Sequence, residues 1–555
     1  MMHRASFMAL PRLEGIIEED DGSEEAILET SEHDDSGDCI IVPAMLRIAD
    51  KLFVNKRKPL NEPQGSSEAL TILNNEKNSE SLHYARGCHS ILSSLIQDSD
   101  TPLEFSPSNS EANINNQILM KIQNIVEVGL RRQNLREELY CQALLSLHLA
   151  QSARQQKIAW VYLALLVGCF LPSQRLKSLL DNFISEKSSE NISEALYCGE
   201  KLKRSNEAMV QKKAEKIDGV DIFHELRQQR RAPPSSYEFW AAIRKSQSVV
   251  AVVCPDEAKR SVAADSSSTA AEIVEKVCAR LEIKDPFGFS LFIRAGQRLA
   301  PVGEGGVYLM DAIWQAERFS AEQGLDPPQV FLRRDLFPLH WHPELDRPAA
   351  RLIFAQVCSS VRTGENRTNS SQDLALLAAY QFINENGRVL DHNEKRITQH
   401  CDQVMPGSVF RNAQKSTKKE WIKMVQKTIS EVKKLNPIDL TSDVIVEKVV
   451  RFALNTWSAS FSRRYDIRGF SIIGKQKEAS GHISLEMNHR TFHIRSLSGE
   501  EYHKIMTKHI RKCFLLPVRE DGLGRIQIAT DEEIINLITP FSAELHKIIN
   551  RLISN

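Results

Sequence analysis

The stretch "IAWVYLALLVGCFLPSQRL", residues 158–176, is the most apolar part of this chain of 555 residues. No charged side chain interrupts it from Ile158 to Leu171, and Pro172 ends the apolar run. A helix that spans a bilayer needs about 20 predominantly apolar residues, whereas a run of roughly 10 to 14 more often forms a buried core helix. The length therefore predicts a helix that neighbouring helices enclose on all sides.

The flanking segments supply those neighbours. Ile118, Ile122 and Ile125 recur with the period of a helix. The same period continues in three further segments, "NLREELYCQALLSLHLA" (134–150), "SQRLKSLLDNFI" (173–184) and "SEALYCGEKLKRS" (193–205). Consecutive amphipathic helices around one wholly apolar helix predict a helical bundle.

Composition and charge indicate an ordinary globular protein. The chain has 71 basic and 72 acidic residues, so no overall field favours nucleic acid or an anionic membrane. Its ten cysteines form no CxxC pair, which is typical of free thiols in a reducing compartment. The apolar patch at the start is too short for a secretory signal. We therefore expect a cytoplasmic protein.

Residues 14–38 contain twelve acidic residues and neither lysine nor arginine. Such a segment repels itself and has few large apolar groups, so residues 1–42 are predicted to be a disordered acidic tail.

The pattern changes after residue 246. Strands are predicted in "VVAVVCPD" (249–256), "FGFSLFI" (287–293) and "PQVFLRR" (328–334), with a helix in "TAAEIVEKVCARLEI" (269–283) opened by the capping box Thr269-x-x-Glu272. This order indicates a small β-grasp unit.

Residues 345–456 return to helical periodicity, and the last hundred residues are mixed. "GHISLEMNHRTFHIRSL" (481–497) and "GRIQIAT" (524–530) are predicted strands, and "PFSAELHKIINRLI" (540–553) is a predicted amphipathic closing helix. "EEYHKIMTKHIRKCFLL" (500–516) has helical spacing.

Several separated motifs carry a family resemblance. "LREELYCQ" (135–142), "LLVGCFLPSQRL" (165–176) and "YCGEKLKR" (197–204) resemble the myosin-tail-homology (MyTH4) bundle. "RAPPSSYEF" (231–239) resembles the linker that joins this bundle to a FERM domain. "KDPFGFSLFI" (284–293), "YLMDAIWQAERFSAEQG" (308–324) and "VFLRRDLFPLHWHP" (330–343) resemble the first FERM lobe of class VII unconventional myosins. "LIFAQVCSSVRTGE" (352–365) is similar to the second lobe.

The resemblance implies a multidomain α+β fold, an all-α bundle followed by a three-lobed FERM domain. The lobes are a ubiquitin-like β-grasp, an acyl-CoA-binding-protein-like helical lobe, and a PH-like β-lobe with a C-terminal helix. The expected bounds are 43–230 for the bundle, 231–246 for the linker, and 247–337, 338–456 and 457–555 for the three lobes.

The chain departs from the family in three ways. It has no GxxxxGK[ST] phosphate loop and hence no motor, and it has one tail tandem where two are expected. The third lobe is divergent beyond Tyr465, so a peptide groove there is in doubt.

No catalytic or metal-binding set is found by motif. His400-Cys401 begins like a phosphatase loop, but Gly407 stands where the arginine is needed. His340 and His342 lack the further ligands that a metal requires. We therefore predict no enzyme activity and no cofactor.

Two groups of basic residues are candidates for acidic partners, although a solvated helix face is the competing interpretation of each. The first group is Lys201, Lys203, Arg204, Lys212, Lys213, Lys216, Arg227, Arg230 and Arg231. The second group is Lys415, Lys418, Lys419, Lys423 and Lys427, on a predicted helix of the second lobe.

The resemblance implies a cytoskeletal adaptor, a myosin-type cargo-binding tail module. Expected partners are cargo or scaffold proteins and adhesion-receptor tails, with microtubules, other acidic peptides or an anionic membrane surface as further candidates, and no nucleic acid. The alternative is a membrane-proximal FERM module that binds anionic lipid and receptor tails. We also expect the acidic tail to fold back onto residues 201–231 and compete with outside acidic ligands.

Overall fold

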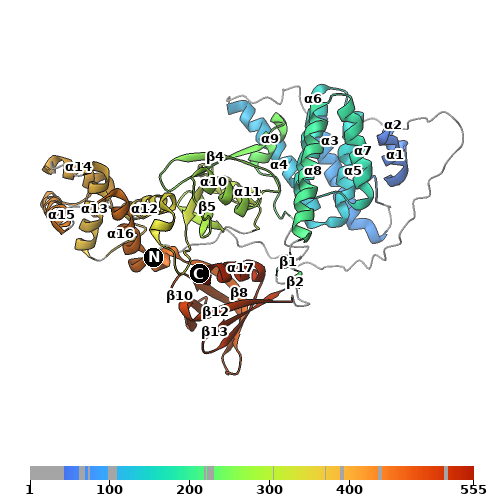
Figure 1. Cartoon of the computed structure of the whole chain (residues 1–555). Helices are drawn as coiled ribbons and strands as arrows, with labels where there is room; N and C mark the ends of the chain where they lie inside the picture. Colours follow the sequence, from blue (N-terminus) through green and yellow to red (C-terminus); the bar gives the residue numbers. More distant parts are fainter. Residues whose placement is uncertain are drawn as a thin grey trace.

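The structure is a computed structural model, and it describes residues 43–61, 69–72, 76–97, 109–214, 216–217, 220–221, 230–303, 306–368, 370–387, 393–435, 440–517 and 523–554. The predicted acidic tail lies outside these residues. The described chain forms a helical region, a five-stranded sheet, a second group of helices and a seven-stranded sheet, in that order (Figure 1). The fold is therefore mixed α+β, with a helical region first.

The helical region is built around one buried helix. Its helices are α1 (Ala44–Leu52), α2 (Lys58–Asn61), α3 (Ser79–Gln97), α4 (Asn109–Arg131), α5 (Arg136–Leu149), α6 (Ala153–Cys169), α7 (Gln174–Ser189) and α8 (Ser193–Ala214). A capping box between Ser152 and Gln155 begins α6, and every residue from Ile158 to Cys169 is buried. Helices α3, α4, α5 and α8 pack around it. The prediction of an enclosed apolar helix is confirmed.

None of the helices in the described part of the chain has the length and hydropathy needed to cross a membrane.

Helix α9 (Ser236–Arg244) joins the helical region to the first sheet. A capping box between Ser235 and Glu238 begins it, and Lys245 ends it in the left-handed conformation. Phe239 belongs to the core of the helical region, whereas Tyr237 packs against the core of the next unit. The helix therefore contributes to two cores at once.

The five-stranded sheet has the order β4-β3-β7-β5-β6, and β3 and β7 are parallel. Its elements are β3 (Ser248–Val253), β4 (Lys259–Ala264), α10 (Ala270–Arg280), β5 (Phe289–Ala295), β6 (Arg298–Gly303), α11 (Leu309–Glu322) and β7 (Gln329–Arg334). Thr269 caps α10 by accepting from the Glu272 N–H, and its hydroxyl lies 3.3 Å from the Glu272 carboxylate. Helices α10 and α11 pack against the sheet.

The second group of helices shares a continuous core with this sheet. It consists of α12 (Arg347–Arg362), α13 (Ser371–Asn386), α14 (Glu394–Val404), α15 (Lys415–Leu435) and α16 (Ser442–Thr456). The Gln356 amide on α12 accepts from the backbone N–H of Arg334 and donates to its carbonyl, both at 2.8 Å. The Gln356 side chain thus joins the end of β7 to α12 through both backbone groups of Arg334.

The seven-stranded sheet has its own core and the order β11-β10-β9-β8-β14-β13-β12. Its elements are β8 (Arg463–Ile472), β9 (Glu478–Met487), β10 (Thr491–Ser496), β11 (Glu501–Met506), β12 (Ile510–Leu516), β13 (Gly524–Thr530), β14 (Ile534–Thr539) and α17 (Ser542–Ile553). The closing helix α17 packs on β12 and β13.

The helical spacing expected at 500–516 is wrong, because this segment forms β11, a short 3-10 turn (Thr507–His509) and β12. The turn and a register shift between Ile510 and Lys512 move the buried positions out of strict alternation. The buried residues Ile505, Ile510 and Cys513 are therefore five and three positions apart, a spacing that resembles a helix more than a strand.

Candidate functional site

Three residues of the first basic group, Lys201, Arg204 and Arg230, meet at the boundary between the helical region and the first sheet. Lys201 and Arg204 lie on α8, and Arg230 lies in the connection to α9. Lys201 is only 2% exposed and Arg230 only 5%. These two side chains therefore face the interior of the protein.

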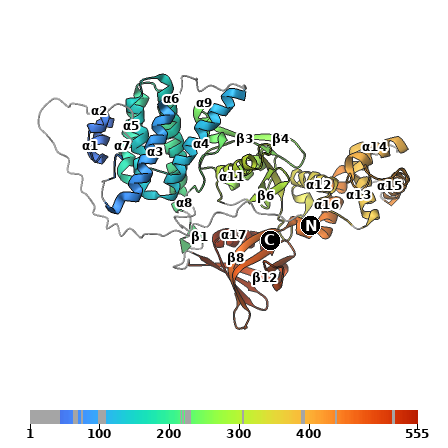
Figure 2. The ribbon, with the colours of Figure 1, turned by 180° about the vertical axis from the view of Figure 1, so that it is seen from behind.

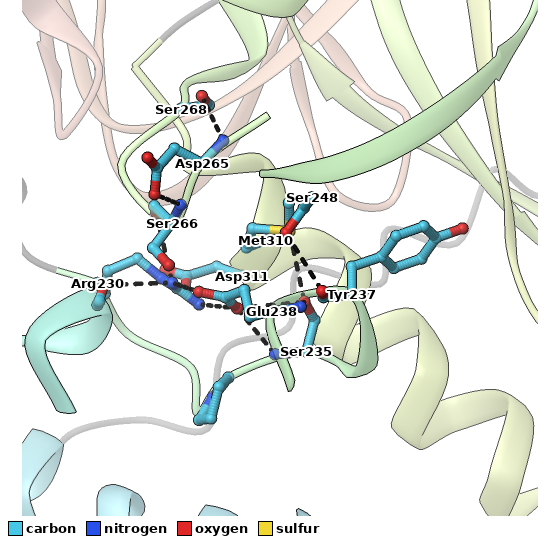
Figure 3. Close-up of polar contacts among 12 residues, drawn as sticks. Arg230, Ser235, Tyr237, Glu238, Ser248, Asp265, Ser266, Ser268, Met310 and Asp311 are labelled. Carbon is cyan, nitrogen blue, oxygen red and sulfur yellow. Dashed lines mark hydrogen bonds and ion pairs between the residues drawn. The ribbon is translucent and has the colours of Figure 1, made fainter. Parts of the chain in front are cut away.

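Arg230 is held by two carboxylates (Figure 3). Its Nη1 and Nη2 donate to the two oxygens of Glu238 at 2.5 and 3.1 Å, and its Nε donates to Asp311 Oδ1 at 2.5 Å. Nη1 also lies 3.4 Å from the Gly168 carbonyl and 3.3 Å from the Ser266 carbonyl. The guanidinium thus connects the end of α6, helix α9, the loop after β4, and α11.

Both carboxylates are also bonded to the backbone of the linker. The Ser235 N–H donates to Glu238 Oε2 at 2.8 Å, and the Arg231 N–H donates to Asp311 Oδ2 at 2.8 Å. A third carboxylate, Glu317 on α11, accepts from the Ser236 N–H at 3.0 Å. The linker backbone along 231–236 is therefore held by its own Glu238 and by two carboxylates of α11.

The ionisation of this cluster follows from burial and charge together. Burial opposes the ionised form of Glu238, but the Arg230 charge and its hydrogen bonds outweigh burial and lower the Glu238 pKa to about 2. At Asp311 burial is the larger effect and raises the pKa despite Arg230. The two carboxylates raise the pKa of Arg230, so the arginine stays charged.

Two more cations complete the cluster. Arg204 Nε lies 2.5 Å from Asp265 Oδ2, and Lys201 Nζ lies 5.9 Å from the centre of the Tyr197 ring. Burial disfavours the Lys201 charge, but Tyr197, Glu238 and Asp265 outweigh burial and raise its pKa. Apart from Glu317, whose pKa burial raises, the cluster contains three cations, Lys201, Arg204 and Arg230, and three carboxylates, Glu238, Asp265 and Asp311. In the ionised state its charges cancel, as burial requires.

This geometry corrects part of the first candidate set. Lys201 and Arg230 cannot meet an outside partner, because their charges are enclosed and neutralised within the protein. Lys203 and Arg231 are exposed, and Arg204 is half-buried in its ion pair. The side chains of Lys212, Lys213 and Lys216, and the whole of Arg227, lie outside the described part of the structure.

The second candidate set lies on one helix, as predicted. Lys415, Lys419, Lys423 and Lys427 are exposed and four residues apart on α15, so they form a slowly turning stripe. Lys418 is half-buried, with its Nζ 5.8 Å from the centre of the Phe410 ring. Lys427 lies 3.8 Å from Glu431.

A second buried cluster joins the seven-stranded sheet to the first. Arg463, at the start of β8, donates through Nε and Nη2 to Asp335 Oδ1 at 2.9 and 2.7 Å. Its Nη2 also donates to the Ser290 hydroxyl at 2.5 Å. Next to Asp335, Leu336 enters the core of the seven-stranded sheet, while Phe337 belongs to the core of the first sheet. The segment after β7 is therefore shared by both units.

The outer edge of β12 is covered at its centre. The Asn550 side chain on α17 accepts from the Cys513 N–H and donates to the Cys513 carbonyl, both at 3.0 Å. A peptide that added to this edge as a strand needs those two backbone groups. A peptide that adds to this edge therefore competes with the Asn550 side chain for the backbone of Cys513.

Cys401 and His342, which the sequence offered as candidates for a nucleophile and a metal ligand, both contact other protein groups in the structure. Cys401 is fully buried, and burial raises the pKa of its thiol to about 12, so it is not a ready nucleophile. His342 accepts from the Glu344 N–H at 3.4 Å and lies 3.6 Å from Glu447. Within the described part of the chain, no three His, Cys, Asp or Glu side chains are grouped to hold a metal ion.

The carboxylates Glu238, Asp311 and Asp335 were missed by the sequence analysis. Only Glu238 had a local signal, the Ser235-x-x-Glu238 spacing of a capping box. The other two are recognisable only by their distant arginine partners.

Comparison with known proteins identifies two domains at these positions. Residues 122–241 match the MyTH4 domain family, and residues 246–334 match the RA like domain family. The chain is 30% identical over 357 residues to Myosin-VIIa of Drosophila melanogaster, which covers 63% of this chain and 15% of that protein. The chain therefore spans a small part of the length of this relative.

Solved structures show the same fold. The MyTH4-FERM MF2 domain of Dictyostelium discoideum Myosin VII matches with a TM-score of 0.61 at 16% identity, covering 92% of this chain and 99% of that one. The C-terminal MyTH4-FERM domain of human Myosin 7b, solved in complex with the harmonin-a PDZ3 domain, matches with a TM-score of 0.55 at 15% identity, covering 91% and 95%. The chain thus has the MyTH4-FERM fold, with a helical region followed by β-sheet domains.

Proposed function

We propose that this chain, which joins a MyTH4 domain to an RA-like domain and is homologous to class VII myosin tails, is a non-catalytic cytoskeletal adaptor. It links partner proteins to the cytoskeleton in the manner of a cargo-binding tail. The observation that carries this proposal is the buried, charge-balanced cluster around Arg230, which fastens the helical region, the linker and the first sheet together. Such a platform holds binding surfaces in fixed positions and needs no reactive group.

We also propose bounds for the bundle, the linker and the three lobes of the FERM domain. The order β4-β3-β7-β5-β6 supports a ubiquitin-like first lobe at 247–337. Helices α12 to α16 support an acyl-CoA-binding-protein-like second lobe at 338–456, and seven strands with α17 support a PH-like third lobe at 457–555. The bundle then occupies 43–230 and the linker 231–246.

The partner class follows by analogy. Since a Myosin 7b tail of this fold was solved with a PDZ domain, we propose that this chain binds scaffold proteins, with adhesion-receptor tails as further partners.

A bridging experiment tests the adaptor role. Proteins captured from cell extract by the intact chain are identified, and the most enriched one is purified and pelleted with actin filaments or microtubules, with and without the chain. We expect the partner to enter the pellet only when the chain is present. No chain-dependent pelleting of any purified partner, or turnover of a metabolite by the chain, contradicts the proposal.

The lysine stripe on α15 favours a second function, a membrane-proximal FERM module. If this holds, the chain co-sediments with liposomes that contain phosphatidylserine and not with neutral liposomes. Replacement of Lys415, Lys419, Lys423 and Lys427 by Gln then reduces pelleting, whereas Lys203→Gln on α8 does not. Pelleting with microtubules instead of liposomes favours the first function. Because Lys201 and Arg230 are buried, two cations of the first basic group are not available to bind microtubules.

A further inference from the structure

The first two helices form a basic corner that the sequence analysis did not single out. It consists of six exposed cations, Arg47, Lys51, Lys56, Arg57, Lys58 and Arg175. Arg47 and Lys51 are one helical turn apart on α1, Lys56 and Arg57 lie in the turn that follows, and Lys58 begins α2. Arg175 at the start of α7 donates to the Lys51 carbonyl, which places it beside α1.

Few acidic groups neutralise this corner. Asp50 pairs with Arg57, with Oδ1 2.9 Å from Nε. The nearby carboxylates of Glu137 and Glu186 accept from the Ser173 hydroxyl at 2.9 Å and the Ala44 N–H at 2.8 Å, and these uncharged donors leave both negative charges in place. Among the described residues, Arg47, Lys51 and Lys56 have no ion-pair partner. Six cations against the three carboxylates of Asp50, Glu137 and Glu186 leave the corner with a formal net charge of +3.

The corner is held firmly on the helical region. Met45, Ile48 and Leu52 of α1 are buried in its core. The Val54 N–H donates to the Leu70 carbonyl at 2.7 Å, and residues 70–71 are held in turn by the buried Glu138 carboxylate. The backbone that carries these cations is therefore fixed, so that binding a polyanion orders their side chains but not the chain itself.

We propose that the acidic segment 14–38 of this chain docks on the basic corner and occludes it. Twelve carboxylates in 25 residues complement six cations. Only residues 39–43 separate Asp38 from α1, and five residues span at most about 18 Å when extended. A short tether gives an effective concentration of about 1 mM, so weak surface ion pairs, each contributing about 0–1 kcal/mol, suffice together.

Other basic surfaces fit this segment less well. The α15 stripe lies at the opposite end of the molecule from α1 and α2 in both views (Figures 1 and 2). Two cations of the 201–231 set are buried, which weakens our earlier expectation that the segment docks there. Consequently an outside acidic ligand reaches the basic corner only by displacing the segment. This inference does not depend on the adaptor role.

Lysine footprinting of the full chain tests the contact. The intact chain is compared with a variant in which the twelve acidic residues of 14–38 are replaced by their amides, and acetylation by a dilute reagent is followed residue by residue. We expect Lys51 and Lys56 to react at least about threefold more slowly in the intact chain, because a millimolar effective concentration keeps a submillimolar contact mostly occupied. Lys419 and Lys423 on α15 serve as internal controls and should react equally in both.

The outcomes separate the alternatives. Protection that disappears in 0.5 M salt, at a Debye length of roughly 4 Å, supports the proposal. Equal rates in the two chains, protection confined to Lys203, or protection that survives high salt overturns it.

A binding measurement provides an independent check. A fluorescent peptide of residues 14–38 is titrated into three full-length chains. We expect it to bind the amide variant, to bind the intact chain at least about threefold more weakly because the attached segment competes, and to lose binding when Arg47→Gln, Lys51→Gln and Lys56→Gln are added to the amide variant. All three positions are exposed, so these changes leave the core intact. Equal affinity for all three chains contradicts the proposal.

Discussion

Arg230 carries a full charge inside the protein because two carboxylates and two carbonyl oxygens surround it. Removing the arginine leaves Glu238 and Asp311 buried without their counter-charge. The cluster is therefore more sensitive to the loss of one member than surface ion pairs are.

For Arg230→Gln we expect a loss of about 3–5 kcal/mol in the free energy of unfolding, the usual cost of leaving a buried charge unpaired. The matched control is Arg318→Gln, which removes an exposed pair with Glu322 and should cost less than about 0.5 kcal/mol. Denaturant titration measures both variants. Equal losses contradict the structural role of the cluster.

His489 lies in the turn between β9 and β10, where burial, and secondarily Arg490, lower its pKa from 6.5 to about 4. Its ring is 6.4 Å from the Phe337 ring, at the junction with the first sheet. The folded protein therefore favours neutral His489, and between pH 6.5 and about 4 the unfolded chain binds the additional proton.

The stability contribution of neutral His489 is complete above pH 6.5 and is lost as the pH falls towards 4. The depression corresponds to roughly 3 kcal/mol at most. We expect His489→Gln to lose less stability than the unmodified chain between pH 7 and pH 4, in parallel denaturant titrations. Identical pH dependence of the two chains excludes this assignment.

At the scale of elements, α6 decides how closely the helical region approaches the first sheet. A Cβ at Gly168 is 2.5 Å from the Ser266 hydroxyl and 2.7 Å from Lys201 Cε. Both neighbours are buried members of the charged boundary, so neither moves freely.

We predict that Gly168→Ala destabilises the protein by about 1–3 kcal/mol through overpacking. Gly87→Ala in the exposed part of α3 is the control, because nothing lies within 4 Å of its Cβ. That change should stabilise the helix by about 0.5–1 kcal/mol. Thermal unfolding distinguishes the two, and a neutral Gly168→Ala would show that the boundary is loosely packed.

At the scale of the whole molecule, two buried arginines fasten three cores. Arg230 joins the helical region to the first sheet, and Arg463 joins the first sheet to the seven-stranded sheet. The second group of helices needs no such fastener, since it shares a core with the first sheet. Helix α17 adds a backbone bond from the Leu339 N–H to the Leu552 carbonyl at 2.9 Å.

For Arg463→Gln we expect the contact between the seven-stranded unit and the first sheet to weaken by about 3 kcal/mol. The unit itself should stay folded, because all its buried core residues except Leu336 come from the unit. Faster hydrogen exchange at Leu339, with unchanged exchange in β9 and β13, is the expected signature. Arg551→Gln removes only an exposed pair with Asp285 and should leave Leu339 unchanged. Faster exchange throughout the strands would instead mean that the unit depends on Arg463 to fold.

Local patterns in the sequence were sufficient for much of the fold. The apolar run at 158–171 required enclosure because its length is too short for a bilayer, and α6 is enclosed. Alternation at 287–293 required a strand, and β5 covers most of it. These features depend on neighbours within one or two turns, which the chain order displays directly.

Tertiary structure alone decided which charges are buried and which strands lie at the edges. Lys201 and Lys203 are two residues apart and chemically alike, yet only Lys201 is buried. Arg230 meets Asp311 across 81 positions and Arg463 meets Asp335 across 128, so no local pattern reveals these pairs. The helical period at 500–516 was misleading because a turn and a register shift imitated it. Charge burial and strand pairing depend on groups distant along the chain, and only the folded protein brings those groups together.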